Sequence, residues 1–254
     1  MLMSLPKGTV ARTRNRLQGR LPIPPPRLIY LVGGMYDADE FCAGGASANQ
    51  RIRETLSKNG VDFRTFEAIL DFGCGVGRII RHWELNAGTR LFGTDYNPEL
   101  IRWCQSNLPI AKFQINGLKA RLEYENDQFS FAYAWSVFTH LTESGQLDWL
   151  DELSRVLRPG GYLYLTTHGD YYVSQLSHDE QEQYRNGHLV VLTGGSEGSN
   201  FCNAYHPSQY VRERFTKNFT IVDHVPEGAA GNSFQDVYLL QKREPNNALP
   251  KSSH

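Results

Sequence analysis

The residues of this chain best suited to bind a ligand lie between positions 68 and 78, in the stretch AILDFGCGVGR. A short apolar run predicts a buried strand that ends near Asp71. Three glycines follow in alternate positions, Gly73, Gly75 and Gly77. Because glycine lacks a Cβ, such a turn can adopt positive φ and let a ligand approach the backbone. Helical character over Arg78–Trp83 would aim the free N–H groups of a helix N-terminus at a carboxylate or a phosphate.

The spacing and the charge of this turn restrict the ligand. Its third glycine comes one position earlier than in the G-x-G-x-x-G fingerprint of dinucleotide-binding proteins. Asp71 precedes the first glycine and would repel a pyrophosphate. A zwitterionic amino-acid tail satisfies both features, since its carboxylate would face the helix and its ammonium group the acid. The alternative is a strand–turn–helix unit that binds nothing.

A second acid, Asp95, follows the predicted strand Arg90–Thr94. Its separation from Gly73 is that expected of the acid at the tip of the second strand in a nucleoside-binding βαβ unit. A carboxylate there accepts hydrogen bonds from both ribose hydroxyls. Asn97 and Pro98 then predict the start of a helix. A plain turn residue is the alternative interpretation of Asp95.

The glycine stretch resembles motif I of the class I S-adenosylmethionine-dependent methyltransferases, small-molecule type. Leu157–Leu163, LRPGGYL, resembles a second pattern of that family, L-x-P-G-G-x-L. The resemblance covers roughly residues 66–242. It implies an α/β fold: a Rossmann-like, doubly wound, seven-stranded sheet with an antiparallel last strand, plus an N-terminal cap segment. It also implies S-adenosyl-L-methionine as the cofactor.

The resemblance assigns cofactor binding to residues at the ends of four predicted strands. Asp95 would bind the ribose, Tyr96 would lie against the adenine, and Asn116 would hydrogen-bond the adenine amine, although Asn116-Gly117 could also be only a turn. The strand tip Ala134–Ser136 would face the methionine part and the acceptor. The full set is Asp71, Gly73, Cys74, Gly75, Gly77, Asp95, Tyr96, Asn116, Gly117, Leu118, Trp135 and Ser136.

Three histidines are candidates for a catalytic base, His140, His168 and His206. Histidine exchanges a proton near neutral pH, and a base is needed only if the acceptor is a hydroxyl of high pKa. Packing or capping is the alternative role of His140. No metal-ligand spacing is visible, so we expect no metal. In the N-terminal segment, Tyr36, Phe41 and Arg53 are candidates to shape the substrate pocket, or to be ordinary packing and surface charge.

Hydrophobic patterns predict the elements that position these residues. Further strands are expected at 111–115, 129–136, 162–167, 219–225 and 234–241, and helices at 46–58, 144–157, 177–184 and up to about 217. The last two strands are joined by a short link and should be antiparallel. We divide the chain into an arm and cap segment, 1–60, a methyltransferase domain, 61–242, with a substrate-side insertion, 170–200, and a polar tail, 243–254.

The composition restricts partners and location. The 254 residues carry a formal net charge of −1, which gives no reason to expect nucleic acid. No apolar run crosses a membrane, no secretory leader is visible, and the four cysteines are widely spaced, which indicates a cytoplasmic protein. Residues 1–26 are basic and proline-rich, and we interpret them as a disordered arm, a homodimer arm or a lid.

These observations predict methyl transfer from S-adenosylmethionine to a small-molecule acceptor by in-line displacement. A hydroxyl of a sugar or secondary metabolite is preferred, because histidines and aromatic residues gather at the expected mouth of the site. The alternatives are an N-methyltransferase of a small amine and a non-catalytic nucleoside-binding protein. A nicotinamide-dependent oxidoreductase is disfavoured, because the third glycine is misplaced and no Tyr-x-x-x-Lys follows the fourth strand.

Overall fold

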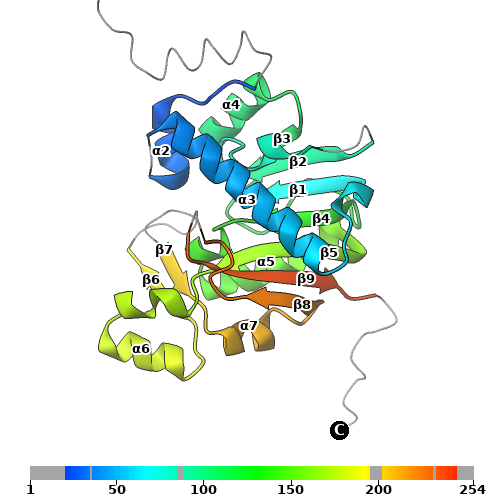
Figure 1. The fold of residues 1–254 in the computed structure, drawn as a ribbon. Coiled ribbons are helices and arrows are strands. Elements are labelled where there is room, and N and C mark those ends of the chain that lie inside the picture. The colour runs from blue at the N-terminus through cyan, green and yellow to red at the C-terminus, as the bar shows by residue number, and fades with distance from the viewer. Residues whose placement is uncertain (1–20, 35, 85–87, 195–201, 231–232, 245–254) are drawn as a thin grey trace, which may run out of the picture.

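One mixed sheet of seven strands organises the computed structural model, which describes residues 21–34, 36–84, 88–194, 202–230 and 233–244 (Figure 1). The strand order is β3-β2-β1-β4-β5-β9-β8. Their bounds are β1 Ala68–Phe72, β2 Arg90–Asp95, β3 Lys112–Ile115, β4 Phe129–Ala134, β5 Leu157–Thr167, β8 Phe219–Val225 and β9 Asp236–Lys242. The expected doubly wound sheet is confirmed.

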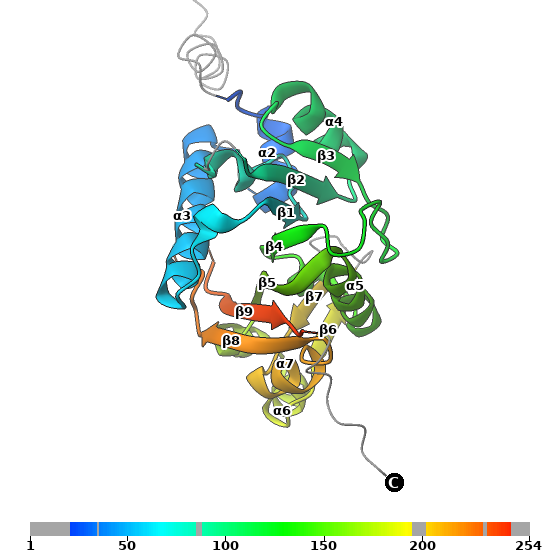
Figure 2. The same ribbon diagram turned by 90° about the vertical axis from the view of Figure 1, so that its right-hand side faces the viewer.

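Helices cover both faces of this sheet, as Figure 2 shows for α3 and α5 on opposite sides. The helices are α2 Pro26–Gly33, α3 Ala38–Lys58, α4 Pro98–Asn107, α5 Glu143–Val156, α6 His178–Arg185 and α7 Ser208–Arg214. Alternate side chains of each strand enter two separate cores. On β4, Phe131 and Tyr133 pack with α2, α3 and α4, whereas Ala132 and Ala134 pack with α5 and α7. This two-sided burial explains the nearly unbroken apolar runs of the central strands.

The order of the strands reverses between β1 and β4. β1 pairs in parallel with β2 on one side and with β4 on the other. The connections after these two strands therefore leave the carboxyl edge of the sheet in opposite directions. In open α/β sheets, ligands bind in the crevice at this reversal point. The fold thus brings Asp71, Asp95 and Trp135, which follow or end three neighbouring strands, to one place.

The terminal strands confirm the predicted hairpin. β9 lies between β5 and β8 and is antiparallel to both. β8 spans the predicted residues 219–225, and β9 begins and ends within two residues of the prediction. The polar tail is described only up to residue 244.

The glycine turn departs from the prediction. No α-helix follows Gly77 in the described residues 78–84, and a single 3-10 turn, η2 Ile80–His82, takes its place. The predicted helix N-terminus is therefore wrong. Gly73, Gly75 and Gly77 have φ of 77°, 55° and 71°, so the chain turns repeatedly before η2. Two adjacent β-branched residues, Ile79 and Ile80, then bury their side chains and are poor helix formers.

Two other segments contain more structure than the sequence predicted. α2 precedes the expected cap helix, and α3 begins at Ala38, eight residues before the predicted start at 46. The region predicted as an insertion, 170–200, contains α6, a 3-10 segment η4 Asp170–Gln175 and the strand β6 Val190–Thr193, which pairs antiparallel with β7 Cys202–Tyr205 just after it. Figure 1 shows α6 and this pair together beyond one end of β5 and β9. The predicted arm, residues 1–26, lies mostly outside the described residues.

Candidate functional site

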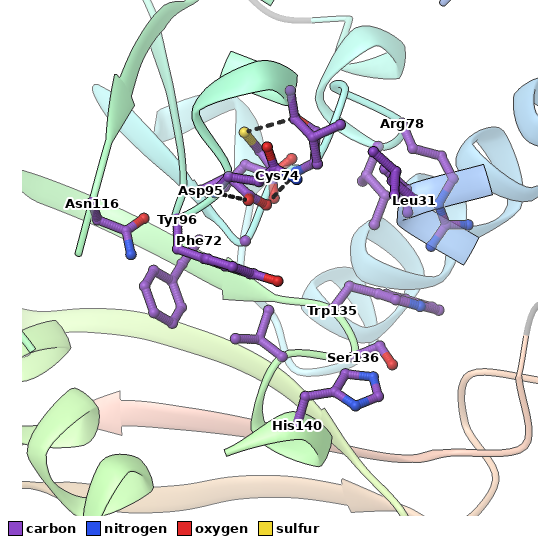
Figure 3. A pocket seen from close by; sticks show the side chains of 18 of the residues that line it. Leu31, Phe72, Cys74, Arg78, Asp95, Tyr96, Asn116, Trp135, Ser136 and His140 are labelled. Carbon is purple, nitrogen blue, oxygen red and sulfur yellow. Dashed lines mark hydrogen bonds between the residues drawn. The ribbon is translucent and has the colours of Figure 1, made fainter. Parts of the chain in front are cut away.

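A cavity of about 530 Å³ opens at the carboxyl ends of β1, β2 and β4 (Figure 3). Its walls come from the glycine turn, from the residues after β2, β3 and β4, and from α2. Its volume lies within the range typical of small-molecule sites. Of the predicted cofactor residues, eleven line it: Asp71, Gly73, Cys74, Gly75, Asp95, Tyr96, Asn116, Gly117, Leu118, Trp135 and Ser136.

Gly77 is the predicted cofactor residue that does not line the cavity. A Cβ at Gly77 would lie 2.5 Å from Leu108 Cδ1, so this glycine permits the packing of the turn on α4. Gly75 faces α2 instead, and a Cβ there would lie 2.7 Å from Val32 Cγ2. The two glycines therefore serve different contacts, although their sequence context is alike.

Asp95 ties the end of β2 to the glycine turn. Its Oδ2 accepts a hydrogen bond from Gly75 N at 2.9 Å, and its Oδ1 accepts one from Asn97 N at 2.8 Å. Burial raises the pKa of Asp95, and these two N–H donors oppose that rise. Each carboxylate oxygen keeps a second lone pair. Because Asp95 lines the cavity, these two lone pairs could accept hydrogen bonds from the two hydroxyls of a ribose.

Asp71 is the buried acid beneath the turn. Tyr133 Oη donates to Asp71 Oδ2 at 2.7 Å, which fixes the carboxyl group toward the core side of the cavity. Burial raises the pKa of Asp71 to about 7, while the Tyr133 hydrogen bond and the charge of Arg78 hold it down. A cationic group that enters the cavity beside Asp71 would favour the carboxylate form.

The rim of the cavity beyond β3 carries the predicted adenine residues. Thr94 Oγ1 donates to Asn116 Oδ1 at 2.7 Å, and Asn116 Nδ2 donates to Gly117 O at 2.8 Å. Asn116 is thus held in one orientation, with a second lone pair on its oxygen still free to accept. Tyr96 and Leu118 are exposed at this rim, with 41% and 47% of their surface accessible, so both side chains are available to contact a flat ring.

The opposite wall is built at the tip of β4. Trp135 and Ser136 line the cavity, but Ala134 is fully buried in the core, so its prediction as a pocket residue is wrong. Ser136 has φ of 58°, a left-handed conformation that is uncommon for serine. Gln235 Nε2 donates to Ser136 Oγ at 2.8 Å, and Ser136 N donates to Thr166 Oγ1 at 2.8 Å. This support from β5 and from the segment before β9 was not predicted.

His140 is the one candidate base of the three that lines the cavity. It ends a 3-10 turn, η3 Phe138–His140, and burial lowers its pKa. Its Nδ1 lies 2.8 Å from the carbonyl oxygen of Cys202, the first residue of β7. A carbonyl only accepts, so Nδ1 carries the proton and Nε2 keeps its lone pair. Because burial lowers the pKa of His140, the neutral ring is favoured, and its Nε2 can accept a proton.

The other two histidines support this region without lining the cavity. His168 follows β5 and meets the His140 ring edge-on, with ring centroids 6.4 Å apart. Burial and the neighbouring His140 lower the pKa of His168 to about 4. His206 is completely buried, its Nε2 lies 3.0 Å from Gln146 Oε1, and burial lowers its pKa to about 3. His206 is thus a packing residue of the α5 and α7 layer.

The N-terminal segment contributes residues other than those predicted. Phe41 is fully buried in the core, and Arg53 lies over the Phe63 ring at 5.1 Å; neither lines the cavity. Tyr36 is exposed and stacks on Tyr30 at 4.5 Å. The cavity residues of this segment are Tyr30, Leu31, Val32 and Gly34. Arg78, from the glycine turn, was also missed; the sequence signal was its position directly after the third glycine.

No group of three or more histidines, cysteines or acids in the described ranges is placed to hold a metal ion. Within the same ranges, no helix has the length and apolar character needed to cross a membrane.

Comparison with known proteins identifies the central part of the chain. Residues 69–161 match the family described as methyltransferase domain. Over 104 residues the chain is 30% identical to the malonyl-[acyl-carrier protein] O-methyltransferase of Salmonella typhimurium, covering 41% of this chain and 40% of that protein. The chain thus matches less than half the length of this curated relative.

Solved structures share the fold over a larger part of the chain. An S-adenosylmethionine-dependent methyltransferase from Methanosarcina mazei superposes with a TM-score of 0.55 at 22% identity, covering 74% of this chain and 97% of that one. The 1,6-didemethyltoxoflavin-N1-methyltransferase of Burkholderia thailandensis, solved with bound S-adenosylhomocysteine, gives 0.56 at 16% identity and covers 96% and 93% of the two chains. Residues 69–161 therefore match a methyltransferase domain, and the chain shares its fold with solved S-adenosylmethionine-dependent methyltransferases.

Proposed function

We propose that this protein transfers the methyl group of S-adenosylmethionine to a hydroxyl group of a small molecule, with His140 as the base. The observation that carries the proposal is the arrangement of the cavity. Asp95 and Asn116 lie toward one end, and the neutral imidazole of His140 lies on the wall across from them (Figure 3). One ligand-sized space therefore joins a nucleoside subsite to a proton acceptor.

The nucleoside half of the cavity fits the cofactor. Its ribose hydroxyls would donate to the free lone pairs of Asp95, and its adenine would lie at the rim beside Tyr96 and Leu118. The adenine amine would donate to Asn116 Oδ1. The reactive sulfonium would then lie toward Trp135 and Ser136, at the tip of β4. A cation beside the face of Trp135 gains further electrostatic stabilisation.

The proposed reaction requires the acceptor oxygen to be aligned with the methyl group, and it requires one group that accepts a proton. The acceptor oxygen attacks the methyl carbon in line with the sulfur, an O–C bond forms, and the C–S electron pair stays on the neutral thioether product. The hydroxyl proton passes to His140 Nε2. The Cys202 carbonyl holds the other ring proton on Nδ1, and burial, which lowers the pKa of His140, favours the form with Nε2 unprotonated. Holding the two reactants in contact and away from water supplies much of the rate.

An acceptor with a flat or sugar ring fits the surroundings of the histidines. Tyr171 and Phe234 are 46% and 42% exposed and stack at 4.3 Å. Tyr172 packs against both Tyr171 and His168, with centroids 5.1 Å and 4.5 Å apart. This row of rings leads from the neighbourhood of His140 to the surface, and exposed aromatic faces of this kind bind rings by stacking. The O-methyltransferase name of the curated relative also supports an oxygen acceptor.

The direct test is a screen with methyl-labelled S-adenosylmethionine over a library of small hydroxyl and amine compounds. We expect label in a ring-containing hydroxyl compound, and loss of that activity in His140→Ala. Label found in amines, with His140→Ala still active, would favour an N-methyltransferase. Calorimetry with S-adenosylhomocysteine and NAD separates both outcomes from a nicotinamide-binding protein.

A further inference from the structure

Ser136, on the cavity wall after β4, is held by a closed set of hydrogen bonds. Its backbone N donates to Thr166 Oγ1 at 2.8 Å, and Thr166 Oγ1 donates to Gln235 Oε1 at 2.6 Å. Gln235 Nε2 then donates back to Ser136 Oγ at 2.8 Å. Thr166 and Gln235 are both buried. Two polar side chains from distant segments therefore meet at one serine, in surroundings where an unpaired polar group is costly.

Burial fixes the direction of these hydrogen bonds. If the Gln235 amide were reversed, its nitrogen would donate to Thr166 Oγ1, and the Thr166 proton would have no acceptor among the described residues. A buried hydroxyl proton without an acceptor is unfavourable. Gln235 therefore donates to Ser136, and this bond occupies one lone pair of Ser136 Oγ.

Thr139 occupies the other lone pair of Ser136 Oγ. Its Oγ1 lies 3.3 Å from Ser136 Oγ, and Thr139 is fully buried. In the part of the chain that the structure describes, the Thr139 hydroxyl has no other partner, so it must donate to Ser136 if its proton is to be paired. Ser136 Oγ thus accepts two hydrogen bonds, and its own proton is left for a molecule in the cavity that it lines.

The backbone of Ser136 is strained at the same place. Its φ of 58° is a left-handed conformation that residues other than glycine seldom adopt. Residues held in such conformations concentrate at active sites and ligand clamps. The next residue fixes this conformation, because Val137 Cγ2 occupies the space that a Cβ at Gly73 would take. The fold therefore holds Ser136 against the glycine turn in an unfavourable conformation that presents its hydroxyl to the cavity.

The segment that carries Gln235 also carries part of the aromatic row proposed for the acceptor. Phe234, the preceding residue, stacks on Tyr171, and its backbone N donates to Tyr172 Oη at 3.1 Å. One short segment thus fixes both an exposed ring and the orientation of the Ser136 hydroxyl. This link associates Ser136 with the acceptor.

Ser136 also lies close to the proposed base. Only three residues separate it from His140, and η3 keeps both on one wall of the cavity. Figure 3 shows the two side chains together, whereas Asn116 lies at the far end of the view. A molecule whose hydroxyl meets His140 Nε2 therefore brings its neighbouring atoms to Ser136.

We propose that the Ser136 hydroxyl donates a hydrogen bond to an oxygen on the carbon next to the one whose hydroxyl is methylated. The protein thereby selects small molecules with vicinal oxygens, such as the diols of a sugar ring. A site with a fixed donor rejects an analogue that lacks the matching acceptor, because the donor is then left unpaired. This inference rests on the proposed methylation of a hydroxyl and goes further, since it names the second group that the acceptor carries.

The test uses matched acceptors in the labelled-methyl assay on the full chain. The pairs are methyl glucoside with its monodeoxy analogues, catechol with phenol, and any hydroxyl compound found in the screen with its deoxy analogue. Wild type, Ser136→Ala and Ser136→Gly are compared by kcat/KM. Glycine removes the hydroxyl and adopts positive φ readily, so the backbone of that variant is not strained.

We expect wild type to prefer the vicinal member of a pair by about tenfold or more, and both variants to reduce this preference below about threefold. The Kd of S-adenosylhomocysteine, measured by calorimetry, should change less than about threefold. Asp127→Gly is the matched control, since Asp127 also has φ of 58° but lies outside the cavity lining. It should leave the preference unchanged.

Three results would overturn the assignment of Ser136. They are equal rates of wild type on both members of each pair, an unchanged preference in folded Ser136→Gly, and a loss of S-adenosylhomocysteine affinity that leaves the preference intact. Label in no hydroxyl compound is a different outcome, because it overturns the proposed function itself and this inference with it.

Discussion

Asp95→Ala should weaken cofactor binding by removing both ribose acceptors. Each charge-assisted hydrogen bond contributes about 1.5–3 kcal/mol, and one such loss alone corresponds to roughly a tenfold to hundredfold rise in Kd. Asp95 is only 8% exposed, so little water replaces the lost contact. The variant also leaves the backbone N–H groups of Gly75 and Asn97 without their acceptor. We therefore expect a lower melting temperature as well.

A ligand pair separates these two effects of Asp95→Ala. Calorimetry measures the Kd of S-adenosylhomocysteine and of its 2′,3′-dideoxy analogue for wild type and variant. If Asp95 binds the ribose, the variant loses affinity for the complete ligand and much less for the dideoxy ligand. Thr94→Ser is a conservative control at the preceding position, since it keeps the hydroxyl that donates to Asn116.

Two results would refute the ribose assignment. The first is an Asp95→Ala protein that binds S-adenosylhomocysteine as tightly as wild type. The second is an equal loss of affinity for both ligands, which would show that Asp95 acts only by holding the glycine turn through Gly75 N.

The glycine turn, the proposed base and the buried His206 each give a further test. Gly75→Val should abolish S-adenosylhomocysteine binding in calorimetry, since φ is 55° and Val32 occupies the space of the new side chain; Gly60→Val, also at positive φ but with open space, is the control. His140→Ala should lower kcat by about 10²–10⁴ without changing cofactor Kd, and wild-type kcat should rise with pH through a His140 pKa below the ordinary value near 6.5. Burial holds the pKa of His206 at about 3, so the unfolded chain binds a proton between pH 6.5 and 3 that the folded one does not. The free energy of unfolding should therefore decrease as the pH is lowered from 6.5 to 3, by up to about 1.4 kcal/mol per pH unit. Urea titrations of wild type and His206→Gln measure this, and the decrease should be less steep in the variant.

The sheet could be predicted from the sequence because its signals are local. β1, β2 and β4 begin at the predicted residues; β1 ends next to Gly73, and β2 ends at Asp95. The strand order follows from family resemblance rather than from the runs themselves. The helix after the turn was predicted wrongly, because the charged and apolar residues of Arg78–Trp83 have helical spacing but follow three residues with positive φ.

The cofactor half of the site could be predicted for the same reason. Asp71, Asp95 and Asn116 stand at strand ends, where the fold needs polar residues and the chain shows them one after another. Arg78 was missed although it directly follows the third glycine, because its place in the cavity wall depends on how the turn packs against α3 at Gly45. Such packing between distant segments leaves no local pattern.

The acceptor half could not be predicted, because contacts between distant segments define it. His140 is oriented by a carbonyl 62 positions later, and Ser136 is held by a side chain 99 positions later. β7 carries that carbonyl, and the backbone bond from His206 N to His168 O at 2.8 Å docks β7 at the end of β5. β7, directly after the predicted insertion, therefore sets the tautomer of the proposed base, although none of its residues lines the cavity. In our proposal, changes in this insertion can alter the acceptor and the rate together, while the cofactor site, built on β1 and β2, stays as it is.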